Sequence, residues 1–197
     1  MLDADYFKRL AKVQKPEFLW IGCADSRVPA NEITNAEPGE IFVHRNIANL
    51  VFTNDLNLLS VLEYAVLVLR VKHVIVCGHY GCGGVRASMQ PQTLESIDKW
   101  LQNLRDTYEL NHERLERIEN LDLRADLLTE LSVEEQVKNL SKIPIVQKAW
   151  SEWNQPVLHG WVYRLSDGIL NPISRIDPQT SPISDRLVDS LPDQKKI

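Results

Sequence analysis

Residues 56–84, LNLLSVLEYAVLVLRVKHVIVCGHYGCGG, contain the pattern that decides the fold. Residues 56–70 are apolar on nearly all sides and too long for a strand, which predicts a buried helix. The polar residues at 53–55 precede this helix and can cap its first turn. The β-branched run at 73–77 then predicts a buried strand that opens into a glycine-rich turn.

Two further apolar runs precede the predicted helix. Residues 18–23 indicate one strand, and residues 40–45 indicate a second strand after the turn signal at 37–39. A strand, a helix and another strand in that order form a crossover unit, because parallel strands need a long connection. The order therefore predicts a parallel sheet.

The second half of the chain begins with a long stretch, 93–153, whose pattern is mostly helical. Within it, Ser132 followed by Glu135 is a capping-box pattern and predicts that a helix begins there.

The C-terminal part favours a strand at 157–165, a tight turn at 166–168 and a short edge strand at 169–170. Residues after about 171 are polar, and we expect them to form a loosely held tail. The whole chain, residues 1–197, is therefore predicted to be a single α/β domain. Its central, mostly parallel sheet is flanked by helices and carries an antiparallel edge strand near the C-terminus.

Composition excludes several classes of partner. The net charge is −5 and the lysines and arginines are scattered, so no basic face for nucleic acid is expected. No apolar run reaches the length of a membrane-spanning helix, so no membrane partner is expected either. The first residues lack an apolar signal region, which favours a cytoplasmic location.

The chain has three cysteines, Cys23, Cys77 and Cys82. An odd, small number argues against a disulfide framework. In a reducing compartment, such thiols are buried small hydrophobes, nucleophiles or metal ligands. We interpret Cys77, inside the predicted strand, as a buried apolar residue.

Functional residues of parallel sheets lie just beyond the C-terminal ends of the strands. The first predicted strand ends at Cys23, and the strand at 73–77 leads into His79 and Cys82. These three side chains can therefore converge at one sheet edge. Two thiolates and an imidazole suit Zn²⁺, whereas Mg²⁺ and Ca²⁺ prefer oxygen ligands. Three ligands leave a fourth position for water, as in catalytic zinc sites; a closed structural zinc site is the alternative.

Asp25 and Arg27 lie close to the first cysteine. The carboxylate can either reach the metal, which would fill the fourth position, or be held by Arg27 in a bidentate pair. In the second arrangement it can accept a hydrogen bond from a zinc-bound hydroxide. A solvated surface pair is the plainer interpretation.

Three segments taken together resemble the β-class carbonic anhydrases, specifically the bacterial type. They are 23–28 (CADSRV), 44–49 (HRNIAN) and 77–84 (CGHYGCGG). The resemblance extends over residues 5–167 and implies zinc-dependent, reversible hydration of carbon dioxide to bicarbonate and a proton. It also implies a homodimer that assembles into a homotetramer. The segment before Cys23 is shorter than the family's usual N-terminal arm, which bears on dimer stability and not on zinc chemistry.

The family's catalytic residues carry over one by one. The resemblance implies one Zn²⁺ per subunit held by Cys23, His79 and Cys82, with Asp25 joining them in an inactive state. It implies Asp25 and Arg27 as the catalytic dyad.

Two pockets carry over as well. The family's substrate cleft at the dimer interface matches Gln14, Phe42, Ile47, Tyr64 and Gly83, although core packing equally explains the apolar members.

In one branch of the family, a tryptophan, an arginine and a tyrosine bind bicarbonate away from zinc and favour the inactive state. Trp20, Arg45 and Tyr163 match that trio. The plainer interpretation is two core aromatics and an ion-pair partner.

Two rival functions stay open at this stage. One is a related zinc lyase or hydrolase that acts on another small electrophile, such as carbon disulfide. The other is a non-catalytic, zinc-stabilised interaction module, which would use four protein ligands.

Overall fold

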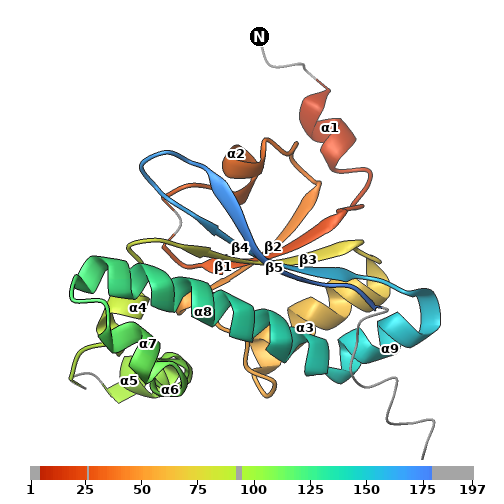
Figure 1. The fold of residues 1–197 in the computed structure, drawn as a ribbon. Helices are drawn as coiled ribbons and strands as arrows, with labels where there is room; N and C mark the ends of the chain where they lie inside the picture. The colour runs from red at the N-terminus through yellow and green to blue at the C-terminus, as the bar shows by residue number, and fades with distance from the viewer. Residues whose placement is uncertain (1–4, 26, 92–94, 179–197) are drawn as a thin grey trace, which may run out of the picture.

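The protein folds around a five-stranded sheet in the order β2-β1-β3-β4-β5. The computed structural model describes residues 5–25, 27–91 and 95–178. Strands β1 to β4 are parallel, and β5 runs antiparallel to β4 (Figure 1). Their bounds are β1 Phe18–Cys23, β2 Ile41–Asn46, β3 His73–His79, β4 Val157–Tyr163 and β5 Leu170–Ile176. The predicted α/β fold with its antiparallel edge strand is confirmed.

Helices cover both faces of the sheet unequally. Figure 1 shows α3, α8 and α9 against one face and the short α2 against the other. The α-helices are α1 Tyr6–Leu10, α2 Ala30–Thr34, α3 Leu56–Glu63, α4 Gly83–Ser88, α5 Glu95–Trp100, α6 Gln102–Leu110, α7 His112–Glu116, α8 Leu121–Lys142 and α9 Pro144–Trp153. A 3₁₀ turn, η1 Ile47–Asn49, and a π-helical segment, η2 Tyr64–Val68, complete the described elements. Among these residues, no helix is both long and apolar enough to cross a bilayer.

The main core lies between the sheet and α3, α8 and α9. Ile21 and Val76 from the central strands are fully buried there against Leu62 of α3 and Val137 of α8. Strands β1 and β3 have parallel neighbours on each side, which explains their nearly unbroken apolar sequence.

The helix predicted at 56–70 is present as α3 continued by η2. Asp55 caps it, because its side chain accepts a hydrogen bond from the Asn57 backbone N–H at 3.0 Å. The expectation of burial on nearly all sides is wrong. Leu56 and Val68 are 79% and 60% exposed, since the sheet covers only one side of the helix in the single chain.

The predicted helix start at Ser132 is also wrong. Helix α8 is continuous from Leu121 to Lys142, and Asn120 caps it by accepting from the backbone N–H of Asp122 and Leu123. Ser132 is buried in the middle of this helix. A serine followed three residues later by a glutamate therefore does not mark a helix start here.

Strand β5 is longer than the short edge strand predicted at 169–170. It reaches Ile176, whose side chain packs against the main core, so the tail boundary expected at about 171 falls inside a strand. Pro172 lies beside the irregularity between Gly160 and Trp161, where an edge strand tolerates a residue without an N–H group. Residues 179–197 of the predicted tail lie outside the described residues.

Candidate metal centre

The side chains of Cys23, His79 and Cys82 meet at the C-terminal edge of the sheet. Cys23 ends β1, His79 ends the neighbouring β3, and Cys82 immediately precedes α4. One potential ligand atom from each residue lies within 4.8 Å of the other two. The two Sγ atoms are 3.8 Å apart. Two sulfurs that share a tetrahedral Zn²⁺ at about 2.3 Å lie about 3.8 Å apart, so this spacing fits zinc.

The group is buried in apolar surroundings. Its three residues are at most 5% exposed, and both cysteines belong to an apolar cluster with Leu101, Leu104 and Leu128. Among the described residues, no other group of three or more cysteine, histidine or acidic side chains has ligand atoms this close together.

The orientation of the His79 ring leaves one nitrogen for a metal. Nδ1 lies 3.2 Å from the Tyr80 carbonyl oxygen and must donate, because that oxygen can only accept. Nε2 then carries a lone pair. It is buried without a hydrogen-bond partner, which is costly unless a further group such as a cation satisfies it.

The two cysteine side chains shift each other's pKa in opposite directions. The hydrogen bond from the Cys82 thiol lowers the pKa of Cys23, and backbone N–H groups of Asp25 and Ala48, at 3.4 and 3.3 Å from the sulfur, lower it further. The same hydrogen bond to Cys23, with burial, raises the pKa of Cys82. A divalent cation bound to both sulfurs would stabilise both cysteines as thiolates.

The backbone beside Cys23 adopts a conformation that few residues favour. Ala48, whose N–H reaches the Cys23 sulfur, has φ 63° and ψ 26°. The Asn46 side chain closes this loop, since its Oδ1 accepts from the Leu50 N–H and its Nδ2 donates to the Leu50 carbonyl, both at 2.8 Å. The fold thus maintains a strained residue at the centre, where such strain is commonly functional.

Asp25 stands beside the group and is held by Arg27. The Arg27 Nε and Nη2 atoms donate to the two carboxylate oxygens at 2.8 and 2.6 Å, a bidentate pair. This pair lowers the pKa of Asp25. The Asp25 Oδ2 atom is also 3.9 Å from the His79 Nε2 atom, so the carboxylate borders the candidate metal position.

Trp20, Arg45 and Tyr163 lie behind the same strand ends. A side chain at Gly22 would overlap Trp20 Nε1 and come within 3.6 Å of Arg45 Nη1, so these two donors border one small space. Trp20 Nε1 is buried without a partner, while Arg45 donates to the Cys23 carbonyl at 2.8 Å. Tyr163 shares a buried cluster with Trp20, and burial raises its pKa to about 12, so the hydroxyl stays protonated.

The residues predicted for a substrate cleft are only partly brought together. The rings of Phe42 and Tyr64 have centroids 5.9 Å apart. Ile47 lies against Gly84, the second residue of α4, whereas a side chain at Gly83, the first residue, would meet no atom within 4 Å. Gln14 lies exposed in the segment between α1 and β1.

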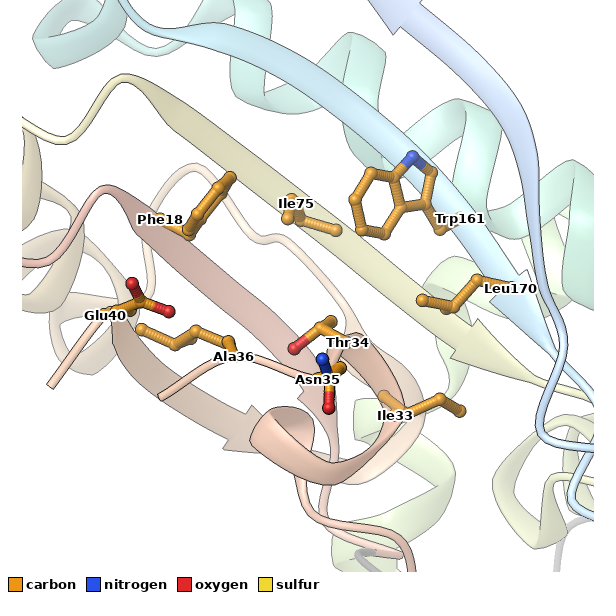
Figure 2. Close-up of a pocket in the computed structure, with 10 residues that line it drawn as sticks. Phe18, Ile33, Thr34, Asn35, Ala36, Glu40, Ile75, Trp161 and Leu170 are labelled. Carbon is orange, nitrogen blue, oxygen red and sulfur yellow. The ribbon is translucent and has the colours of Figure 1, made fainter. Parts of the chain in front are cut away.

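A cavity of about 340 Å³ lies elsewhere, between α2 and the sheet (Figure 2). Phe18, Ile75 and Trp161 from three adjacent strands form its floor, and Asn35 and Glu40 lie at its margin. None of its lining residues belongs to the cysteine–histidine group or to the predicted cleft. It is therefore a feature separate from the metal centre.

Four side chains near the centre were not predicted. Tyr80 donates to Glu130 of α8, and Arg164 joins Tyr80 to Asp126 of the same helix. The only sequence signal is that the two acidic residues are four apart and so share a helix face.

Comparison with known proteins gives a consistent result. A family model described as carbonic anhydrase matches residues 18–170. The carbonic anhydrase of Emericella nidulans is 49% identical over 172 residues, which cover 87% of this chain and 75% of the relative. Among solved structures, the β-carbonic anhydrase CafA of Aspergillus fumigatus has a TM-score of 0.85 and 38% identity, over 93% of this chain and 87% of that one. A structure of the tetrameric β-carbonic anhydrases of Sordaria macrospora has a TM-score of 0.84 and 36% identity, over 88% and 89%.

Proposed function

The chain belongs to the β-carbonic anhydrase family, and from this premise we propose that it catalyses the reversible hydration of carbon dioxide to bicarbonate and a proton. The observation that carries the proposal is the buried Cys23–His79–Cys82 group with the Asp25–Arg27 pair beside it. Purified, zinc-loaded protein should accelerate carbon dioxide hydration at pH 8.5 in a stopped-flow indicator assay. Metal-loaded protein without activity there would refute the proposal.

We propose one Zn²⁺ per subunit, held by Cys23, His79 and Cys82. The donor set, the sulfur spacing and the unsatisfied His79 Nε2 atom support this. When bound, zinc lowers the pKa of a coordinated water to about 7 and so supplies a nucleophile near neutral pH. Replacing His79 by alanine should abolish zinc retention and activity together, measured by metal analysis on the purified protein.

The chain's own residues orient the reactants. Asp25, fixed by Arg27, presents Oδ2 as an acceptor that can align the attacking oxygen. We propose that Phe42, Ile47 and Tyr64 line an apolar cleft suited to an uncharged linear molecule, with Gln14 and Gly83 as further cleft residues. The contact between the Phe42 and Tyr64 rings and the exposed Ile47 side chain support this. Water adds to the carbon of carbon dioxide, and the released proton leaves to buffer.

We further propose that Asp25 switches between Arg27 and the metal. In the structure the carboxylate is paired with Arg27. If it turned instead to the metal it would occupy the fourth position and exclude water. Activity should then be low near pH 7 and rise above about pH 8, because hydroxide competes better with the carboxylate at higher pH. A flat profile from pH 6.5 to pH 9 would contradict the switch.

Trp20, Arg45 and Tyr163 form the proposed inhibitory bicarbonate site. The unpartnered indole N–H and the nearby guanidinium support it, since a small oxyanion needs such donors. Trp20→Phe removes that N–H together with part of the indole ring, and should weaken bicarbonate inhibition without loss of zinc. Trp153→Phe, whose ring lies beneath Arg70 and packs against the main core, is the matched control. Equal inhibition of parent and Trp20→Phe would exclude the site. The relatives compared above are fungal, so they do not support the bacterial, bicarbonate-regulated subtype. The proposal of that subtype therefore rests on these three residues alone.

We propose a homodimer that pairs into a homotetramer. The tetrameric Sordaria macrospora enzymes support this, as do the exposed apolar side chains of Leu56, Tyr64 and Val68 along one helix. Native mass spectrometry should give a mass of four chains; a monomer at micromolar concentration would contradict it. A cytoplasmic location is proposed from the free thiols, which suit a reducing compartment, and cell fractionation tests it.

The two rival functions are distinguished by the same preparation. Comparing the rates on carbon dioxide and carbon disulfide separates the related lyase. A non-catalytic module would show zinc with four protein ligands at every pH and no turnover.

A further inference from the structure

Tyr80 lies between two of the three candidate ligands and contacts one of them through its backbone. Its carbonyl oxygen accepts the His79 Nδ1 hydrogen at 3.2 Å, and its N–H donates to the Tyr163 carbonyl at 2.9 Å. The position of this carbonyl decides which way the His79 ring turns. It therefore decides where Nε2 points.

The Tyr80 side chain is held from two sides by α8. Its hydroxyl donates to Glu130 Oε1 at 2.6 Å. The Arg164 guanidinium lies over its ring, 4.4 Å from the centroid, and Arg164 Nη2 is 3.1 Å from Asp126 Oδ2. Glu130 and Asp126 are one helical turn apart, so a single rigid helix provides both anchors.

The chain after Tyr80 has little stiffness of its own. Gly81 adopts a φ of 69°, and a side chain there would meet no atom within 4 Å. Without the side-chain anchor, the His79–Cys82 turn would be restrained by its strand end, by the hydrogen bond from the Tyr80 N–H to the Tyr163 carbonyl and by the start of α4.

We propose that Tyr80 and Glu130 are positioning residues for the metal ligand His79. The Tyr80–Glu130 hydrogen bond fixes the Tyr80 peptide, the peptide carbonyl fixes the imidazole, and the imidazole then presents Nε2 to the metal. This inference rests on the proposed zinc site. Outer partners that orient ligating histidines typically contribute 10–100-fold to metal affinity or activity, and we expect an effect of about that size here.

The test uses a second tyrosine that makes the same kind of hydrogen bond but is not adjacent in sequence to a candidate ligand. Tyr108 of α6 also donates to a glutamate, Glu116, with Arg124 beside the pair. Tyr80→Phe and Tyr108→Phe therefore each remove one tyrosine–glutamate hydrogen bond, but only the first lies next to a ligand. Zinc affinity of the full-length variants is measured by competition with a chromophoric chelator. The cobalt-substituted proteins give the cobalt–thiolate absorption spectrum.

Tyr80→Phe should raise the zinc dissociation constant about 10-fold or more and shift the cobalt spectrum. Tyr108→Phe should leave both unchanged. Glu130→Gln keeps an acceptor oxygen and should cost less affinity than Glu130→Ala. Equal zinc dissociation constants for the two tyrosine variants would overturn the inference, even if both lose thermal stability. A parent protein that binds no zinc would instead refute the proposed function on which it rests.

Discussion

A methyl group at position 78 would press directly on α8. A Cβ atom there would lie 2.8 Å from Val133 Cγ2, 3.1 Å from Thr129 Cγ2 and 3.6 Å from Val162 Cγ2. Carbon atoms in good contact are about 3.5–4.0 Å apart, so α8 must retreat locally by about 0.7 Å or more. Overpacking of this kind costs about 1–3 kcal/mol, while losing glycine's freedom in the unfolded chain returns about 0.4–1 kcal/mol. We expect Gly78→Ala to be destabilised by about 1–2 kcal/mol.

The same contact predicts a specific rescue. Val133→Ala alone leaves a cavity and should cost about 2 kcal/mol, from the loss of two buried methyl groups. In the Gly78→Ala/Val133→Ala double variant the added methyl group occupies part of the vacated space. The double variant should therefore lose less free energy of unfolding than the two single variants added together, by at least about 1 kcal/mol. Urea denaturation curves of the parent, the two single variants and the double variant, all at the same protein concentration, measure this double-mutant cycle. Strict additivity, or a Gly78→Ala variant as stable as the parent, would refute the packing argument.

Three further predictions concern the N-terminal cap of α3, the change in stability between pH 7 and pH 5, and the removal of the metal. Asp55→Ala removes the acceptor for the Asn57 N–H and should cost about 1 kcal/mol in urea denaturation, whereas Asp55→Asn should retain most of the cap. Burial, with added repulsion from His73 and Arg175, lowers the pKa of His159 from 6.5 to about 4. The unfolded chain then binds more protons than the folded chain between these values, so stability should fall by about 2 kcal/mol from pH 7 to pH 5. His159→Gln should flatten that slope; an identical slope in both proteins would contradict the assignment. Stripping zinc with a chelator should lower the melting temperature of the parent and not that of Cys82→Ser, because a ligand of the folded state stabilises it by mass action.

The convergence of Cys23, His79 and Cys82 could be predicted because it depends on local sequence and on one general rule of topology. Cys23 and His79 each end a strand that is recognisable by its apolar run. In a parallel sheet, such ends meet at one edge, and β1 and β3 proved to be direct neighbours. Cys82 is only three residues after His79, so the short turn between them keeps the two side chains close together. No long-range packing had to be known.

Other features could not be predicted, since they depend on contacts between distant segments. Nothing local distinguishes Ser132 inside a continuous helix from Ser132 at a helix start; in the structure Ser132 is buried within α8, which begins eleven residues earlier at Leu121. The exposed side of α3 was likewise hidden, because an apolar helix surface has the same sequence whether this chain or another copy covers it. The contact of Tyr80 with Glu130 spans fifty residues and requires the crossing of α8 over the strand ends.

The approach of α8 to the sheet connects the packing of the core with the proposed metal centre. Val133 of this helix comes close enough to β3 and β4 that side chains at Gly78 and Gly160 would each lie 2.8 Å from it. Glu130 lies three residues earlier on the same helix, and Gly78 directly precedes His79. The distance at which the helix rests on these glycines therefore also sets the reach of Glu130 to Tyr80. Under the positioning role proposed for Tyr80 and Glu130, glycine at position 78 would matter for ligand geometry as well as for packing. A residue that displaced α8 would lengthen the Tyr80–Glu130 hydrogen bond, and the Tyr80 carbonyl accepts from the His79 ring.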